Sequence, residues 1–100
     1  MKVNLLKVPF DESRIRHTLA YDSKEARLVV FSMPPGSEVP PHTSPSRVLL
    51  YCAKGSGEFL KGKDWIAVEE GDVVACEPLE PHGMKASTPM IVVATIAPAP

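Results

Sequence analysis

The sequence predicts an all-β protein, and three observations support this fold class. Eleven of the 100 residues are proline, and they leave no helical pattern longer than about ten residues uninterrupted. Short apolar runs alternate with turns rich in glycine and proline, such as residues 54–57 (KGSG) and 69–72 (EEGD). The regular spacing of these runs favours a sandwich or barrel, in which exposed sheet edges are avoided. A chain of 100 residues fits one compact domain.

Nine strands are expected, each bounded by turn residues. They are Val3–Val8, Arg14–Leu19, Ala26–Met33, Arg47–Lys54, Gly57–Lys61, Trp65–Val68, Asp72–Cys76, Gly83–Ala86 and Ile91–Ile96. Residues 34–41 (PPGSEVPP) are assigned to a turn because they contain two proline pairs. The last residues, 97–100 (APAP), are expected to form a frayed tail.

The expected strand Arg47–Lys54 has two largely apolar faces. Alternation places Arg47, Leu49, Tyr51 and Ala53 on one face and Val48, Leu50 and Cys52 on the other. One face then lines the interior, and the other needs cover from a second sheet or a partner subunit. A homodimer is therefore expected.

The composition is that of a globular protein, with 44% hydrophobic residues, 23% charged residues and a net charge of −1. Basic residues are scattered along the chain, which argues against a nucleic-acid-binding stripe. The apolar start is broken at Lys7, too soon for a secretory signal, and the apolar run at residues 90–97 is too short to span a membrane. We therefore expect a cytoplasmic protein that binds neither nucleic acid nor membrane.

Two cysteines, Cys52 and Cys76, lie far apart in the sequence and lack the CxxC spacing of zinc or redox motifs. They are interpreted as small hydrophobic residues packed in strands. A disulfide or a single metal-ligating thiol remains the alternative.

Two stretches carry glycine, proline and histidine in an order that resembles the two motifs of small cupins. The first is GSEVPPHTSPSRVLLYCAKGSGEF, with its motif at about residues 36–57, and the second is GDVVACEPLEPHG at residues 71–83. The chain thus resembles a small single-domain cupin of the conserved-barrel family. This resemblance implies a double-stranded β-helix, or jelly-roll barrel, over residues 1–100.

The resemblance also implies a metal site of three histidines and one glutamate, of which this chain has part. His42 and His82 match the first and third histidines, whereas Ser44 and Arg47 stand where the second histidine and the glutamate are expected. A guanidinium about 5 Å from a divalent ion repels it by about 6 to 7 kcal/mol at an effective dielectric near 20. A transition metal (zinc, manganese, iron or nickel) is therefore expected to be absent or weakly bound. A site of His42, His82 and Cys76 is a further alternative.

The preferred hypothesis is a small-molecule pocket biased toward an anionic or acidic ligand. The residues expected to form it are His42, Ser44, Arg47, Tyr51, His82 and Met84. For Arg47 the simpler alternative is an ion pair with Glu58, Glu77 or Glu80.

Catalytic residues are not assigned, and two enzyme alternatives follow from the resemblance. One is a metal-dependent dioxygenase or isomerase that uses His42 and His82. The other resembles the metal-independent sugar epimerases, with a histidine as base, Tyr51 as acid and Arg47 stabilising an anion. A sensory or interaction module with a vestigial cavity is the remaining class.

Overall fold

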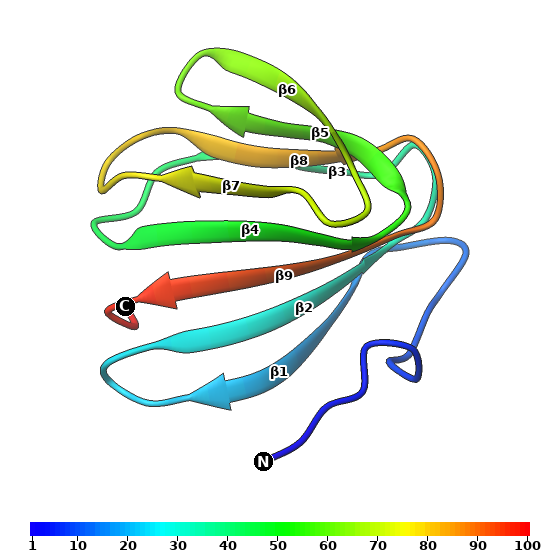
Figure 1. The fold of residues 1–100 in the computed structure, drawn as a ribbon, viewed down its shortest axis with the longest axis horizontal. Helices are drawn as coiled ribbons and strands as arrows, with labels where there is room; N and C mark the ends of the chain where they lie inside the picture. Colours follow the sequence, from blue (N-terminus) through cyan, green and yellow to red (C-terminus); the bar gives the residue numbers. More distant parts are fainter.

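The computed structural model describes residues 1–100 and consists of nine strands joined by turns (Figure 1). The strands are β1 (Arg16–Asp22), β2 (Arg27–Met33), β3 (Glu38–His42), β4 (Arg47–Lys54), β5 (Ser56–Lys61), β6 (Asp64–Glu69), β7 (Val73–Cys76), β8 (His82–Ala86) and β9 (Met90–Ala97). The all-β fold class is confirmed. No helix long and apolar enough to cross a membrane is present.

The strands form two antiparallel sheets that face each other as a jelly roll (Figure 1). The five-stranded sheet has the order β1-β2-β9-β4-β7, and the four-stranded sheet has the order β3-β8-β5-β6. Between the sheets lies one hydrophobic core of thirteen buried residues, of which Phe59, Met33 and Leu50 are among the largest. Burial of such side chains contributes about 1.5 to 3 kcal/mol each.

Strand β3 was not expected, because its sequence, EVPPH, contains two adjacent prolines. It lies at the edge of the four-stranded sheet and pairs only with β8, with an irregularity between Val39 and His42. Proline lacks a backbone N–H and is tolerated on edge strands and at bulges. The assignment of residues 34–41 to a turn is therefore wrong from Glu38 onward.

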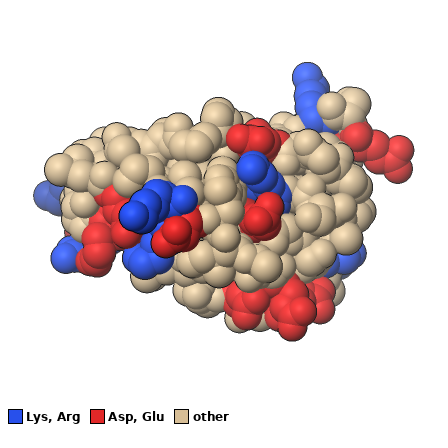
Figure 2. Space-filling model, turned by 90° about the horizontal axis from the view of Figure 1, so that it is seen from above, with Lys and Arg blue, Asp and Glu red and all other residues tan.

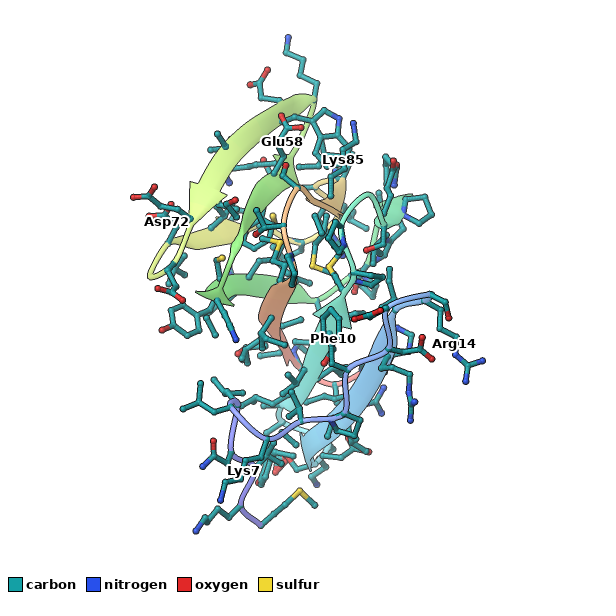
Figure 3. All side chains as sticks on the ribbon, turned by 90° about the vertical axis from the view of Figure 1, so that its right-hand side faces the viewer. Lys7, Phe10, Arg14, Glu58, Asp72 and Lys85 are labelled. Carbon is teal, nitrogen blue, oxygen red and sulfur yellow. The ribbon has the colours of Figure 1, made fainter.

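The segment Val3–Val8, expected to be a strand, forms turns instead. The amide of Leu6 donates to Asn4 Oδ1 at 2.9 Å, and the amide of Lys7 donates to the Asn4 carbonyl at 3.0 Å. An asparagine that bonds the backbone two residues ahead replaces a strand ladder by a local turn. This segment packs on the five-stranded sheet, where Figure 3 shows Lys7 and Phe10.

Residues 97–100, which were expected to fray, are hydrogen-bonded to the rest of the molecule. The Ser46 hydroxyl donates to the Pro98 carbonyl at 2.5 Å, and the Ala99 amide donates to the Lys24 carbonyl at 3.2 Å. Ser46 is buried, so its hydroxyl needs such a partner. These bonds place Pro100 at one end of the space between the sheets.

On the face shown in Figure 2, both basic and acidic side chains are present, and most of the surface belongs to uncharged residues. On the outer side of the four-stranded sheet, Glu58 and Lys85 lie opposite each other in register (Figure 3). The Lys85 ammonium also lies 4.0 Å from the centre of the Trp65 ring, a cation–π contact.

Candidate functional site

A cavity of about 350 Å³ lies between the two sheets, at the end where β3, β8 and the C-terminal residues meet. Its walls are mainly apolar. The lining residues are Phe31, Val39, His42, Thr43, Ser44, Pro45, Val48, Leu50, His82, Gly83, Met84, Ala94, Ile96 and Pro100. Ligand pockets commonly enclose about 300 to 1,000 Å³, so this cavity has room for a small molecule.

Two histidines form the polar part of the cavity wall. His42 ends β3 and His82 begins β8, and the two residues are partners in the register of these strands. Their ring centres lie 4.1 Å apart, with 66° between the planes. His42 is exposed, whereas only 5% of His82 is accessible. The sequence therefore predicted this pair correctly as cavity residues.

Both rings are held by the same kind of hydrogen bond. His42 Nδ1 lies 3.1 Å from the Pro40 carbonyl, and His82 Nδ1 lies 3.2 Å from the Glu80 carbonyl. Because a carbonyl oxygen only accepts, these bonds assign the ring proton to Nδ1 in both residues. Neither Nε2 atom has a hydrogen-bond partner in the protein, so both carry a free lone pair when the rings are neutral.

Burial lowers the pKa of His82, and the neighbouring His42 lowers it further, against the opposing effect of the Glu80 carbonyl. His82 thus binds a proton less readily in the folded state than in the unfolded chain. The stability associated with this group is present above the unfolded value of 6.5 and is lost as the pH falls through the lower folded value.

We therefore expect the free energy of unfolding of the wild type to fall as the pH is lowered below the unfolded value of 6.5. In His82→Gln, which cannot titrate, this fall is expected to be smaller. Urea unfolding at a series of pH values measures both slopes. Equal slopes for the two proteins would show that another group causes the pH dependence.

Arg47 and Tyr51 do not line the cavity, and their expected placement in it is wrong. The burial pattern of β4 confirms the predicted alternation but puts Val48, Leu50 and Cys52 on the core side. Arg47 and Tyr51 belong to the opposite, exposed face. The residues of β4 that line the cavity are therefore Val48 and Leu50, whose side chains have the opposite parity to Arg47.

Arg47 instead forms an ion pair, which was the simpler alternative for this residue. Its Nε donates to Glu77 Oε1 at 3.3 Å, and both side chains are exposed. An exposed ion pair of this kind contributes little to stability. With Tyr51 outside, the histidine and tyrosine pair that an epimerase-like reaction needs is not assembled in the cavity.

Ser44 and Met84 are both found at the cavity, as the sequence predicted. The Ser44 hydroxyl accepts a hydrogen bond from the Ser46 amide at 3.1 Å, which stabilises the loop after His42. The Ser44 carbonyl accepts a hydrogen bond from the Leu79 amide at 2.8 Å. This bond joins the loop after His42 to the loop before His82.

The two cysteines are free and buried, in agreement with the interpretation as core residues. Cys76 belongs to the hydrophobic core and not to the cavity wall. Burial raises the pKa of its thiol, which keeps it protonated. The alternative site of His42, His82 and Cys76 is therefore not formed.

The donor set does not fit the metal centre that the cupin resemblance implies. No group of three or more His, Cys, Asp or Glu side chains is placed to hold an ion, whereas catalytic metal sites usually have three protein ligands. Among the residues that line the cavity, His42 and His82 are the only ones of these four types. We therefore assign no chemical step to a metal.

Several cavity residues were missed, chiefly Phe31, Val39, Ile96 and Pro100. The first three pack against the hydrophobic core from inward faces of their strands, and apolar alternation along each strand is the only sequence signal for them. Pro100 has no such signal, because its position depends on the hydrogen bonds of the tail.

Comparison with known proteins identifies one family and many similar folds. The chain matches the cupin domain family over residues 29–96. An RmlC-like cupin protein from Desulfovibrio desulfuricans is 33% identical, with a TM-score of 0.88 and coverage of 98% of this chain and 96% of the other. Comparison with curated proteins gave no match.

Two more distant structures share the fold. TT1209 from Thermus thermophilus is 18% identical, with a TM-score of 0.88 and full coverage of both chains (100% each). KdgF from Halomonas is 19% identical, with a TM-score of 0.82 and coverage of 89% of this chain and 84% of that chain. At these identities the likeness concerns the fold alone.

Proposed function

Since the chain belongs to the cupin family, we propose that it is a small-molecule-binding cupin whose cavity takes a compact weak acid. The acid has an apolar body that fills the space between the sheets and an acidic group that meets His42 and His82. This proposal keeps an acidic ligand but assigns its recognition to the histidines instead of Arg47.

The observation that carries the proposal is the pair of imidazoles in an otherwise apolar wall. Each Nδ1 is occupied by a backbone carbonyl, and each Nε2 is left without a protein partner. A carboxylate that binds with uptake of one proton from the solvent onto such an atom forms a charge-assisted hydrogen bond with the imidazolium. No Asp or Glu side chain lines the cavity, so a cationic ligand would be buried without a counter-ion, which is unfavourable.

Calorimetric titration tests the proposal with short-chain carboxylic acids of about five to eight carbons and their primary amides, a size suited to this cavity. We expect each acid to bind at least about tenfold more tightly than its amide. His82→Gln is expected to remove most of this difference. Arg47→Ala is the matched control and should bind like the wild type, because its side chain lies outside the cavity.

Two outcomes contradict the proposal. If the amides bind as tightly as the acids, the cavity recognises only the apolar body. If Arg47→Ala weakens binding as much as His82→Gln does, the recognition site lies on the outer face of β4.

We also propose a homodimer formed through the outer face of β4 and β7. Leu49 and Tyr51 project from β4, and Val73, the register partner of Tyr51, projects from β7. They are exposed by 42%, 38% and 59%. In a two-fold interface the same patch of each subunit faces its own copy. An uncharged apolar patch can do this without like-charge repulsion.

Tyr51→Glu is expected to convert the dimer to a monomer, because the interface would then contain two like charges close to the two-fold axis. Ala67→Glu is the control, since Ala67 is exposed on β6 of the other sheet. Size-exclusion chromatography with light scattering measures the mass. A wild-type monomer, or a dimer that persists in Tyr51→Glu, would exclude this interface.

A cytoplasmic location belongs to the same proposal. Two free, buried thiols support it, because reduced cysteines are typical of the cytosol.

A further inference from the structure

The loop Glu77–Pro81 supplies the carbonyl that orients His82. The Glu80 carbonyl accepts the hydrogen bond from His82 Nδ1, at 3.2 Å. The position of this oxygen depends on the loop conformation, which includes a positive φ of 67° at Leu79. Such a conformation is unfavourable for leucine and persists only where surrounding contacts enforce it.

Lys61 of β5 forms an ion pair with this loop. Lys61, the register partner of His82 in β5, donates from Nζ to Glu80 Oε1 at 2.8 Å. Its Nζ also donates to the Ala75 carbonyl at 2.7 Å. Lys61 therefore joins three elements: its own strand, the end of β7 and the loop.

The Glu80 carboxylate completes this arrangement within the loop. Glu80 Oε1 accepts a second hydrogen bond, from the Glu77 amide at 3.0 Å, and the Glu80 amide donates to the Glu77 carbonyl at 3.0 Å. The side chain of Glu80 thus fixes the backbone of the same residue whose carbonyl contacts His82.

We infer that Lys61 and Glu80 are positioning residues for His82: their ion pair holds the loop so that the Glu80 carbonyl keeps the ring proton on Nδ1 and leaves Nε2 open to the cavity. Only the consequence for ligand affinity rests on the proposed function. The tautomer of His82 is a property of the protein alone.

A role of the Lys61–Glu80 ion pair in global stability can be distinguished from its role in positioning His82. The side chains of Lys61 and Glu80 are 39% and 27% accessible, and partly exposed ion pairs add little to global stability. Loss of the pair is therefore expected to change the tautomer of His82 more than the unfolding transition.

The test is nitrogen-15 NMR of the histidine rings at a pH where they are neutral, without ligand. In the wild type we expect His82 to carry its proton on Nδ1. Lys61→Met and Glu80→Gln are expected to give a mixture of both tautomers, with His42 unchanged. Lys61→Arg, which can keep the ion pair, should restore the wild-type tautomer. Lys63→Met, in the exposed turn after β5, is the matched control.

The same variants are then titrated with the short-chain acids, and Lys61→Met and Glu80→Gln are expected to lose roughly three- to tenfold in affinity. A wild-type tautomer in both variants would overturn the inference, as would a change that Lys61→Arg does not reverse or that Lys63→Met reproduces. If the tautomer changes as expected but the wild type binds no acid, the proposed function fails and the positioning role stands.

Discussion

Val48→Glu combined with Ser44→His is expected to create a divalent metal site in the cavity. Both positions line the same cavity as His42 and His82, so the double variant has three imidazoles and one carboxylate around one space. Four such ligands satisfy zinc or cobalt. We expect the affinity for cobalt to rise on the order of a hundredfold or more over the wild type.

The stability of this variant should depend on the metal. A glutamate at the buried position of Val48 carries an unpaired charge without metal, which destabilises the fold. Bound metal neutralises that charge and stabilises the folded state. Cobalt absorption spectra and thermal unfolding with and without the ion measure both effects.

Arg47→Glu with Ser44→His is the control that tests the strand register. It adds the same two side chains, but residue 47 lies on the exposed face of β4, so no comparable affinity is expected. Tight cobalt binding by this control and not by the Val48 variant would mean that Arg47 faces the cavity after all.

Arg47 was wrongly expected in the cavity because an alternating pattern defines the two faces of a strand but does not say which face is inward. The sequence of β4 defines two faces correctly, because side chains alternate along a strand. Which face is inward was undetermined, since Leu49 and Tyr51 on one face are as apolar as Val48 and Leu50 on the other. The tertiary fold decides this, and the outer face stays exposed.

The histidine pair was predictable, whereas its hydrogen bonds were not. Motif spacing located His42 and His82 at the cavity, but the proton positions depend on the carbonyls of Pro40 and Glu80. Those oxygens are placed by an edge strand with two prolines and by a loop with a positive φ at Leu79. Neither feature has a sequence signal that specifies its geometry.

Gly57→Ala is expected to destabilise the protein by about 3 kcal/mol or more. Gly57 lies in β5 between its partners Val68 and Ala86, and a Cβ there would come within 2.0 Å of the Lys85 carbonyl oxygen and 3.1 Å of the Ala86 Cα. Both contacted atoms belong to the backbone, so the steric clash can be relieved only if β5 and β8 move apart. Because β8 begins with His82, the cavity wall is expected to be distorted as well.

Gly71→Ala separates this steric effect from the general cost of replacing a glycine. Gly71 has a φ of 96°, and a Cβ there would meet no atom within 4 Å, so only the backbone strain remains, about 1 to 2 kcal/mol. Urea and thermal unfolding of the two variants give the difference, and Gly57→Ala should lower the thermal midpoint by more than about 10 °C. Equal losses in both variants would indicate that β5 and β8 accommodate a methyl group between them, and that the close approach of these strands does not limit the position of His82.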